Sequence, residues 1–332
     1  MAQHKENKLI LGVDVGGSKI AAALSTTKGE ILARGYNPTL AQSGPNAVID
    51  NILMTIEEAI SQGKVEAEQL SGIGIGAAGI IDSKSGKVIL SPNLPGWQEV
   101  PLRDIIQQHF NIPTYLGNDA NLAALGEWTF GLKKKVANLI YVTVSTGIGG
   151  GIITNGKLYT GASGAAGEIG HMTIDVNGPR CNCGNIGCWE TLASGTALAR
   201  EAVRRIAQGE QTFLVKLVDG DMSRIDAKII FEAAQQGDKL AQELVSHLGF
   251  YLGVGLVNLV NIFNPELILI GGGVAKMGDL LLRPAKRVVK ERAFKTGANT
   301  VKIRPALLGD DSCLLGAVAL VLEYLEQPEN SD

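Results

Sequence analysis

Residues 9–19 read LILGVDVGGSK, an alternating apolar segment that runs into two adjacent glycines. A second apolar segment, Ile20–Leu24, follows directly and ends at a turn, Lys28–Gly29. Alternation interrupted by glycine predicts a β-hairpin, because glycine tolerates the backbone angles of a tight turn. The chain is therefore predicted to open with two strands of a sheet.

The same pattern returns further along the chain, where residues 139–151 read LIYVTVSTGIGGG and a second apolar pair and turn follow at 152–158. Two strand–turn–strand units of this kind suggest two related halves that face a common cleft. Any two glycine-rich hairpins look alike, so the repeat taken alone leaves that simpler explanation open.

Between and after these units, strand and helix patterns alternate, which favours an α/β protein. The predicted helices are 46–60, 102–110, 195–208, 226–236, 238–263 and 313–325, and further strands are predicted at 73–76, 112–116 and 266–270. We expect the last helix to pack on the first half. We therefore expect a small first domain of residues 1–118 plus about 312–332, and a large second domain of residues 119–311.

Composition narrows the classes of protein. The 332 residues are 45% hydrophobic and 19% charged, which is typical of a folded globular protein. A net charge of −3 offers no basic surface for nucleic acid. The start, Met1–Lys8, is polar and unlike a secretory signal, and the apolar stretch Leu248–Phe263 is too short to span a bilayer comfortably. We expect a buried helix there, no membrane partner and a cytoplasmic protein.

Three glycine-rich turns, each after a predicted strand, are candidate phosphate-binding loops. Glycine lets the backbone approach an anion closely and present its N–H groups. Asp14 in the first turn is a candidate ligand of Mg²⁺, which prefers one or two carboxylates and retained waters. A plain turn explains any one of the three, but three at strand ends favour a nucleotide site. The candidate nucleotide-binding residues are Asp14, Gly16, Gly17, Ser18, Lys19, Thr146, Gly147, Gly149, Gly271, Gly272 and Gly273.

Two better-known nucleotide motifs are absent from the sequence. No Gly-x4-Gly-Lys-Ser/Thr loop occurs, and the glycines from Gly147 on do not open a helix as a dinucleotide site requires. A dehydrogenase is therefore disfavoured.

The densest chemical signal is His171 followed by Cys181, Cys183 and Cys188 in a loop rich in glycine and asparagine. One imidazole and three thiolates predict a closed, structural zinc site. Three unrelated core cysteines are the alternative, but such a polar loop has little apolar surface against which they could pack. The fourth cysteine, Cys313, lies in an apolar helical run and is predicted to be a core residue.

Three carboxylates are candidates for contacts with a substrate. Asp119 lies where a strand gives way to a helix, so it is either a helix N-cap or a base that accepts a proton from a substrate hydroxyl. Spacing alone does not decide between these roles. Glu168 and Glu190 flank the cysteine loop, which would hold them rigidly as acceptors for neighbouring sugar hydroxyls.

In this order and spacing, the motifs from Asp14 to the Gly309–Asp310 turn resemble the ROK family of sugar kinases and repressors, most closely its bacterial glucokinases. The most specific part is Gly-Glu-x-Gly-His with Cys-x-Cys-Gly-x2-Gly-Cys-x-Glu at residues 167–190. The resemblance implies an actin-like, ribonuclease-H-like fold of two α/β domains with the active site in the cleft between them. It implies ATP and Mg²⁺ as cofactors beside structural Zn²⁺, and a homodimer or homotetramer.

The resemblance also implies residue roles, with Asp119 as the base for the 6-hydroxyl of a hexose, glucose first. The implied sugar-binding residues are Gly79, Asn93, Asn118, Asp119, Glu168, His171 and Glu190. Ser18 stands where the family usually has Thr, and the loop 76–79 lacks a proline often found there, which leaves the exact hexose open.

Three alternatives remain beside a glucokinase. A kinase for N-acetylmannosamine, mannose or fructose would use the same hydroxyl ligands, although the family's fructokinase pattern Cys-Pro-x-His-Gly is missing. A sugar-responsive repressor would need a helix-turn-helix ahead of Asp14, and the few residues there do not suggest one. A sugar-binding protein without turnover is disfavoured by Asp119 and the three turns. Polyphosphate is an alternative phosphate donor.

Overall fold

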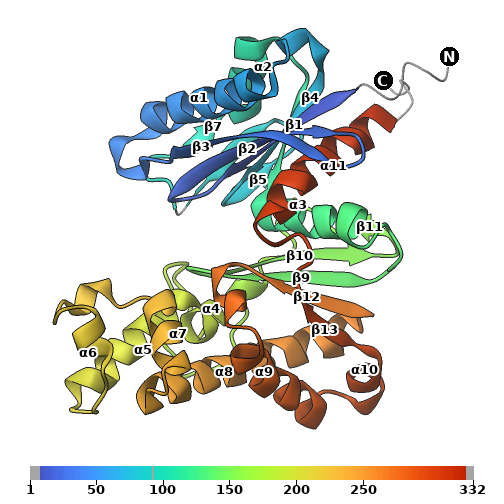
Figure 1. Cartoon of the computed structure of the whole chain (residues 1–332). Helices are drawn as coiled ribbons and strands as arrows, with labels where there is room; N and C mark the ends of the chain where they lie inside the picture. The colour runs from blue at the N-terminus through green and yellow to red at the C-terminus, as the bar shows by residue number, and fades with distance from the viewer. Residues whose placement is uncertain (1–7, 92, 327–332) are drawn as a thin grey trace. The chain divides into compact units, whose positions relative to one another are not determined.

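The computed structural model describes residues 8–91 and 93–326, and these form two compact units (Figure 1). Of the described residues, the first unit holds those up to 137, residues 151–167 and residues 307–326, and the second holds residues 138–150 and 168–306. The boundary expected from the sequence lay between residues 118 and 119. The structure instead keeps residues 119–137 and 151–167 with the first unit.

The first unit is built on a five-stranded sheet with helices on both faces. Its elements are β1 (Leu9–Val15), β2 (Lys19–Thr26), β3 (Ile31–Pro38), α1 (Pro45–Gly63), β4 (Leu70–Ala77), β5 (Ile80–Asp82), β6 (Lys87–Leu90), β7 (Gln98–Val100), α2 (Leu102–Phe110), β8 (Thr114–Asn118), α3 (Asp119–Gly126), β11 (Lys157–Leu158) and α11 (Ser312–Glu326). The strands β5, β6 and β7 form a separate small sheet that the sequence pattern does not predict.

The alternation of side chains along β1 explains how the sheet is covered. Leu11 packs in a core cluster with residues of α1, while Ile10 packs with residues of α11. Gly12 has the same orientation as Ile10, and a Cβ there would overlap with the carbonyl oxygen of Leu314 in α11. The two helices therefore cover opposite faces, and the predicted packing of the last helix on the first half is confirmed. Asp14, two residues beyond Gly12, is on the α11 side.

The second unit contains most of the helices. Its elements are β9 (Leu139–Val144), α4 (Glu190–Ala193), α5 (Gly195–Ala207), α6 (Leu214–Leu217), α7 (Ala227–Gln235), α8 (Lys239–Phe263), β12 (Leu267–Gly271), α9 (Asp279–Arg292), α10 (Lys295–Thr300) and β13 (Lys302–Pro305). The strand β10 (Ile148–Thr154) begins in the second unit and ends in the first.

The two large sheets share one strand order. The first is β3-β2-β1-β4-β8 and the second is β11-β10-β9-β12-β13, so in each the first strand is central and is flanked by the second and the fourth. In each sheet the first strand pairs in parallel with the fourth, and the fourth with the fifth. The repeat seen in the sequence thus corresponds to a repeated topology.

Helix α8 is long and apolar enough by composition to cross a membrane, but 56% of its most apolar window is buried inside the protein. The core helix of a globular protein passes the same test. Gly249 and Gly253 bring α9 close on one side, where a Cβ would overlap with Pro284 or Val288. The helix therefore has the buried character that the sequence predicted.

Candidate active site

Asp14 lies at the carboxyl end of β1, where the chain makes the first glycine turn. It stands beside Gly76 of β4 in register, and Gly76 stands beside Gly117 of β8. Three parallel strands thus end side by side, which is where open α/β sheets place their ligands. The turn is closed by the N–H of Gly16, which donates to the carbonyl oxygen of Lys19 at 3.1 Å.

Thr39 holds this turn, although nothing in the sequence pattern around it indicates this role. Its hydroxyl donates to the carbonyl oxygen of Gly16 at 2.7 Å, and its N–H donates to that of Ser18 at 3.1 Å. Thr39 is fully buried, whereas the side chains of Ser18 and Lys19 are exposed. The turn is thus fixed from inside, and its polar side chains stay open to a ligand.

Asn118, and not Asp119, is the N-cap of α3. The Asn118 side-chain oxygen accepts the N–H of Asn121 at 3.1 Å, and its amide donates to the carbonyl oxygen of Gly79 at 3.1 Å. The sequence left Asp119 as either the cap of this helix or a base, and the structure gives the cap to Asn118. Asp119 is the first helical residue, where its Oδ1 accepts the N–H of Ala120 at 2.8 Å. The helix therefore has its cap without the Asp119 carboxylate.

Asp14 and Asp119 are both partly buried, and their carboxyl groups are close enough for the charge of Asp119 to act on Asp14. Burial and then the charge of Asp119 raise the pKa of Asp14 to about 6, against the opposing effects of a hydrogen bond from Cys313 and of Lys19. Burial also raises the pKa of Asp119. The Cys313 sulfur lies over Gly76, where a Cβ would overlap with it. Neighbouring carboxyl groups whose charged forms are disfavoured by burial are typical of a functional site.

Replacing Asp14 with Asn is therefore expected to raise the melting temperature of the ligand-free protein at neutral pH. A raised pKa means that the folded state binds the proton more tightly than the unfolded chain, so the wild type loses stability as pH rises from about 4 to about 6. Asn carries no charge and escapes this loss. The gain should be small near pH 4 and full above pH 7, as thermal melts across that range would show. A gain independent of pH would contradict buried charge as its cause.

Asn93 and Gly79 complete the predicted sugar-binding residues of the first unit. A Cβ on Gly17 would lie 3.1 Å from the Cβ of Asn93, so the exposed Asn93 approaches the first glycine turn. Gly79 has a φ of +117°, and a Cβ there would overlap with the carbonyl oxygen of Leu90. Close packing thus fixes the loop at Gly79, whose carbonyl oxygen accepts the hydrogen bond from the Asn118 amide.

The second and third glycine turns are neighbours in the second unit. The turn 145–147 follows β9, Gly271 ends β12, and Gly271 stands beside Thr143 in register. A Cβ on Gly272 would overlap with the carbonyl oxygen of Val144. The side chain of Thr146 is exposed. Two of the three predicted phosphate loops therefore lie together, at the carboxyl ends of the neighbouring strands β9 and β12.

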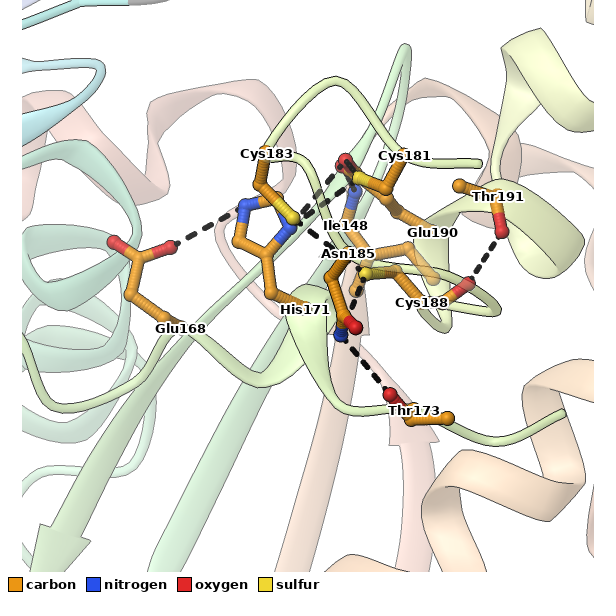
Figure 2. A network of polar contacts seen from close by, with 10 residues as sticks. All are labelled: Ile148, Glu168, His171, Thr173, Cys181, Cys183, Asn185, Cys188, Glu190 and Thr191. Carbon is orange, nitrogen blue, oxygen red and sulfur yellow. Dashed lines mark hydrogen bonds and ion pairs between the residues drawn. The ribbon is translucent and has the colours of Figure 1, made fainter. Parts of the chain in front are cut away.

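The structure brings His171, Cys181, Cys183 and Cys188 together, with their ligand atoms all within 4.8 Å of one another (Figure 2). The Cys181 sulfur is 3.7 Å from His171 Nδ1, and the Cys183 and Cys188 sulfurs are 3.7 Å apart. Cys181 and Cys188 are buried and Cys183 is exposed. Gly187 makes this compact loop feasible, since its φ is +66° and a Cβ there would overlap with the Asp175 backbone.

These distances fit a tetrahedral zinc ion. With Zn–S bonds of about 2.3 Å and Zn–N bonds of about 2.0–2.1 Å, tetrahedral angles separate two sulfurs by about 3.8 Å and a sulfur from a nitrogen by about 3.6 Å. The observed separations of 3.7 Å agree with both. The cluster therefore meets the requirement of a closed Cys3His site.

Glu168 and Glu190 lie on two sides of His171 (Figure 2). Glu168 Oε2 is 3.8 Å from His171 Nε2, whereas Glu190 Oε1 is 3.6 Å from Nδ1 and 3.2 Å from the Cys181 sulfur. The Glu168 side chain is 50% exposed and that of Glu190 only 23%. Of the two carboxylates predicted to accept sugar hydroxyls, Glu168 is the more open.

A family model of the ROK family matches residues 10–324. The chain belongs to the ROK family. The actin-like fold class expected from the sequence is confirmed, because solved ROK proteins superpose on nearly the whole chain.

Similar ROK proteins include both kinases and repressors. The chain is 40% identical to a glucokinase of Halalkalibacterium halodurans, covering 97% of this chain and 96% of that one. A ROK glucokinase of Streptomyces griseus, solved with glucose and AMPPNP, is 36% identical with a TM-score of 0.85 and covers 95% of this chain and 99% of that one. A putative xylose repressor of Caldicellulosiruptor is 38% identical, covering 96% of this chain and 79% of its own. The end-to-end matches to kinases identify this ROK protein as a sugar kinase.

Within this ROK chain, the predicted site residues form two groups. The first unit holds Gly79, Asn93, Asn118 and Asp119 with Asp14 and the first turn, and the second holds the Cys3His cluster with Glu168, Glu190 and the other two turns. Cys313, predicted only as a core residue, is buried and also lies beside Asp14.

Proposed function

We propose that this protein transfers the terminal phosphoryl group of ATP to the 6-hydroxyl of a hexose, with glucose as the first candidate. One observation carries the proposal: Asp119 keeps a carboxylate at the end of a sheet although Asn118 already caps the helix. A carboxylate that the fold does not need for capping, and whose pKa burial raises, is suited to accept a proton. The similarity to a glucokinase solved with glucose and AMPPNP supports the same chemistry.

In the proposed reaction Asp119 accepts the proton of the attacking hydroxyl. A general base works best when its pKa lies near the working pH, and the raised pKa of Asp119 moves it in that direction. Asp14 would hold Mg²⁺ through water, and the ion would neutralise phosphate charge. Lys19 and the N–H groups of the glycine turns would bind and orient the phosphates, which are the main tasks in phosphoryl transfer.

Hexose hydroxyls would be bound by amide, imidazole and carboxylate groups. The proposed residues are Gly79, Asn93, Asn118, Glu168, His171 and Glu190. The Asn118 amide has one N–H left after its bond to Gly79, and Glu168 offers an exposed carboxylate. Structural Zn²⁺ would hold the His171 ring in place through Nδ1 and leave Nε2 free for a hydroxyl or Glu168.

A coupled assay of the purified protein with Mg²⁺ and a panel of sugars tests this proposal. The panel contains glucose, mannose, N-acetylmannosamine, fructose and xylose, each with ATP and with polyphosphate. We expect turnover with ATP and the highest kcat/KM for glucose. Saturable sugar binding without turnover for any donor would contradict the proposal and favour the sugar-responsive regulator suggested by the xylose repressor relatives.

We further propose a homodimer or homotetramer in the cytoplasm. Ile262 and Phe294 are 67% and 76% exposed, and the N–H of Phe294 donates to the side chain of Asn261 at 3.0 Å, so the two apolar side chains share one region. Exposed apolar side chains of this kind are candidates for contact with a second copy of the chain. Light scattering of the wild type and of Phe294→Glu would test this, with a loss of mass expected for the variant.

A further inference from the structure

Glu190 connects the Cys3His cluster to the second glycine turn, and the contacts are made by its two oxygens separately (Figure 2). Oε1 lies 3.2 Å from the Cys181 sulfur and 3.6 Å from His171 Nδ1. Oε2 accepts the backbone N–H of Ile148 at 3.4 Å, a long hydrogen bond. One carboxylate thus spans from the cluster to the turn that we propose binds phosphate.

Gly147 shows that the carboxylate occupies this place closely. A Cβ on Gly147 would lie 2.6 Å from Glu190 Oε2. The φ of Gly147 is not in the left-handed region, so its backbone does not itself demand glycine. The nearest obstacle to a side chain at this position is therefore the Glu190 carboxylate.

The chain that follows the last cysteine holds the same turn at two further points. The N–H of Gly195 donates to the carbonyl oxygen of Ser145 at 2.8 Å, and the hydroxyl of Thr196 donates to that of Thr146 at 2.8 Å. Segment 188–196 therefore runs from the cluster to the turn and contacts it repeatedly.

Trp189 fixes this segment to the core. Its ring is fully buried, its Nε1 donates to the carbonyl oxygen of Tyr251 at 2.9 Å, and it fills the space above Gly255 of α8. The Glu190 side chain is therefore carried beside the turn by a segment that is anchored in the core.

We propose that Glu190 is a positioning residue that orders the turn 145–148. The carboxylate would hold the Ile148 N–H through Oε2, while Trp189 fixes the segment that carries Glu190 to the core. The consequence for nucleotide, weaker phosphate binding, rests on the proposed kinase function. A carboxylate that serves only the sugar would have no such effect on the turn.

Hydrogen exchange followed by mass spectrometry of peptides covering 145–153 tests the proposal without any need for turnover. In Glu190→Ala the amide of Ile148 should exchange roughly fivefold faster or more, the effect of losing one net hydrogen bond. Zinc content is measured in parallel to show that the variant keeps its ion.

Two further variants guard against indirect effects. Gly147→Ala keeps every thiol and Glu190 but displaces the carboxylate, so it should also speed exchange at Ile148, and it decides the matter if Glu190→Ala loses zinc. Thr191→Val is the matched control: Thr191 is buried one residue away and its hydroxyl donates to the carbonyl oxygen of Cys188 at 2.7 Å, so the change perturbs the same segment without touching the turn. Unchanged exchange at Ile148 in Gly147→Ala, or an equal rise in Thr191→Val, would overturn the proposal.

Calorimetry with AMPPNP supplies the functional readout. We expect Glu190→Ala to weaken nucleotide binding several-fold and Thr191→Val to leave it unchanged. A wild type that does not bind the nucleotide would contradict the proposed function, while the exchange measurements would still judge the role of Glu190. Weaker hexose binding in Glu190→Ala with unchanged exchange and unchanged nucleotide affinity would show a sugar ligand alone and would reject the positioning role.

Discussion

Asp119→Asn is expected to lower kcat by about 10²–10⁴-fold, the usual contribution of a general base. The amide has the shape of the carboxylate but cannot accept the proton of a hydroxyl. The hexose dissociation constant should change much less, because an amide can still hydrogen-bond a hydroxyl. Stability should stay the same or rise, because Asn118 holds the helix cap and a buried charge beside Asp14 is removed. The measurements are kcat, the hexose dissociation constant and the melting temperature of one variant.

Asp226→Asn is the matched control. Asp226 is the N-cap of α7, where its side chain accepts the N–H of Ile229 at 2.8 Å, and Asn caps as well as Asp. The same chemical change at a helix start that only caps should alter neither kcat nor the melting temperature. A near-normal kcat in Asp119→Asn would reject Asp119 as the base and require another carboxylate for that role.

Much of the fold could be predicted because its signals are local. The alternating strand and glycine turn at residues 9–19 and again at 139–151 reveal two sheets that prove to share one strand order. The helix patterns at 46–60 and 238–263 correspond to α1 and α8 within a few residues. The small sheet of β5 to β7 was missed because strands of 3 or 4 residues carry too little alternation to be recognised.

The domain boundary could not be predicted, because it depends on contacts between distant residues. Residues 119–126 stay in the first unit because α3 packs on α11, and a Cβ on Gly126 would overlap with the Ser312 backbone. Glu127 adds to this: its fully buried carboxylate accepts the N–H groups of Leu307 and Leu308 and the hydroxyl of Ser312, at 3.0, 2.8 and 2.8 Å. Partners 180 residues or more away along the chain leave no local trace at position 127.

The candidate site also has some features with a local signal in the sequence and others that depend on distant contacts. The four members of the cysteine cluster could be found because their spacing in the sequence is itself the signal. The cap of α3 was ambiguous because Asn118 and Asp119 are neighbours and both residue types cap helices. Thr39, and the contact of Glu190 with Ile148, depend on pairs 23 and 42 residues apart and became visible only in the structure.

Replacing Cys183 with Ser is expected to abolish tight zinc binding and to lower the melting temperature by roughly 10 °C. Loss of a structural metal is among the few single changes that cost about 4 kcal/mol or more, and one kcal/mol corresponds to about 2–4 °C in a protein of 150–250 residues. Cys183 is exposed, so the smaller oxygen leaves no cavity in the core. Without a metal this substitution would be close to neutral. Metal analysis and thermal melting measure both effects, with about one zinc per chain expected in the wild type.

Chelation separates the role of the metal from that of the side chain. A strong chelator should lower the melting temperature of the wild type but change Cys183→Ser little, because both treatments remove the same ion and their effects cannot add. Cys313→Ser is the control: its sulfur lies over Gly76 and outside the cluster, so this variant should keep its zinc and its response to the chelator. Hexose affinity should fall with the metal, since the cluster holds His171 and the carboxylates beside it. A metal-free wild type with full stability and full hexose affinity would show that hydrogen bonds within the loop suffice to hold His171 in place.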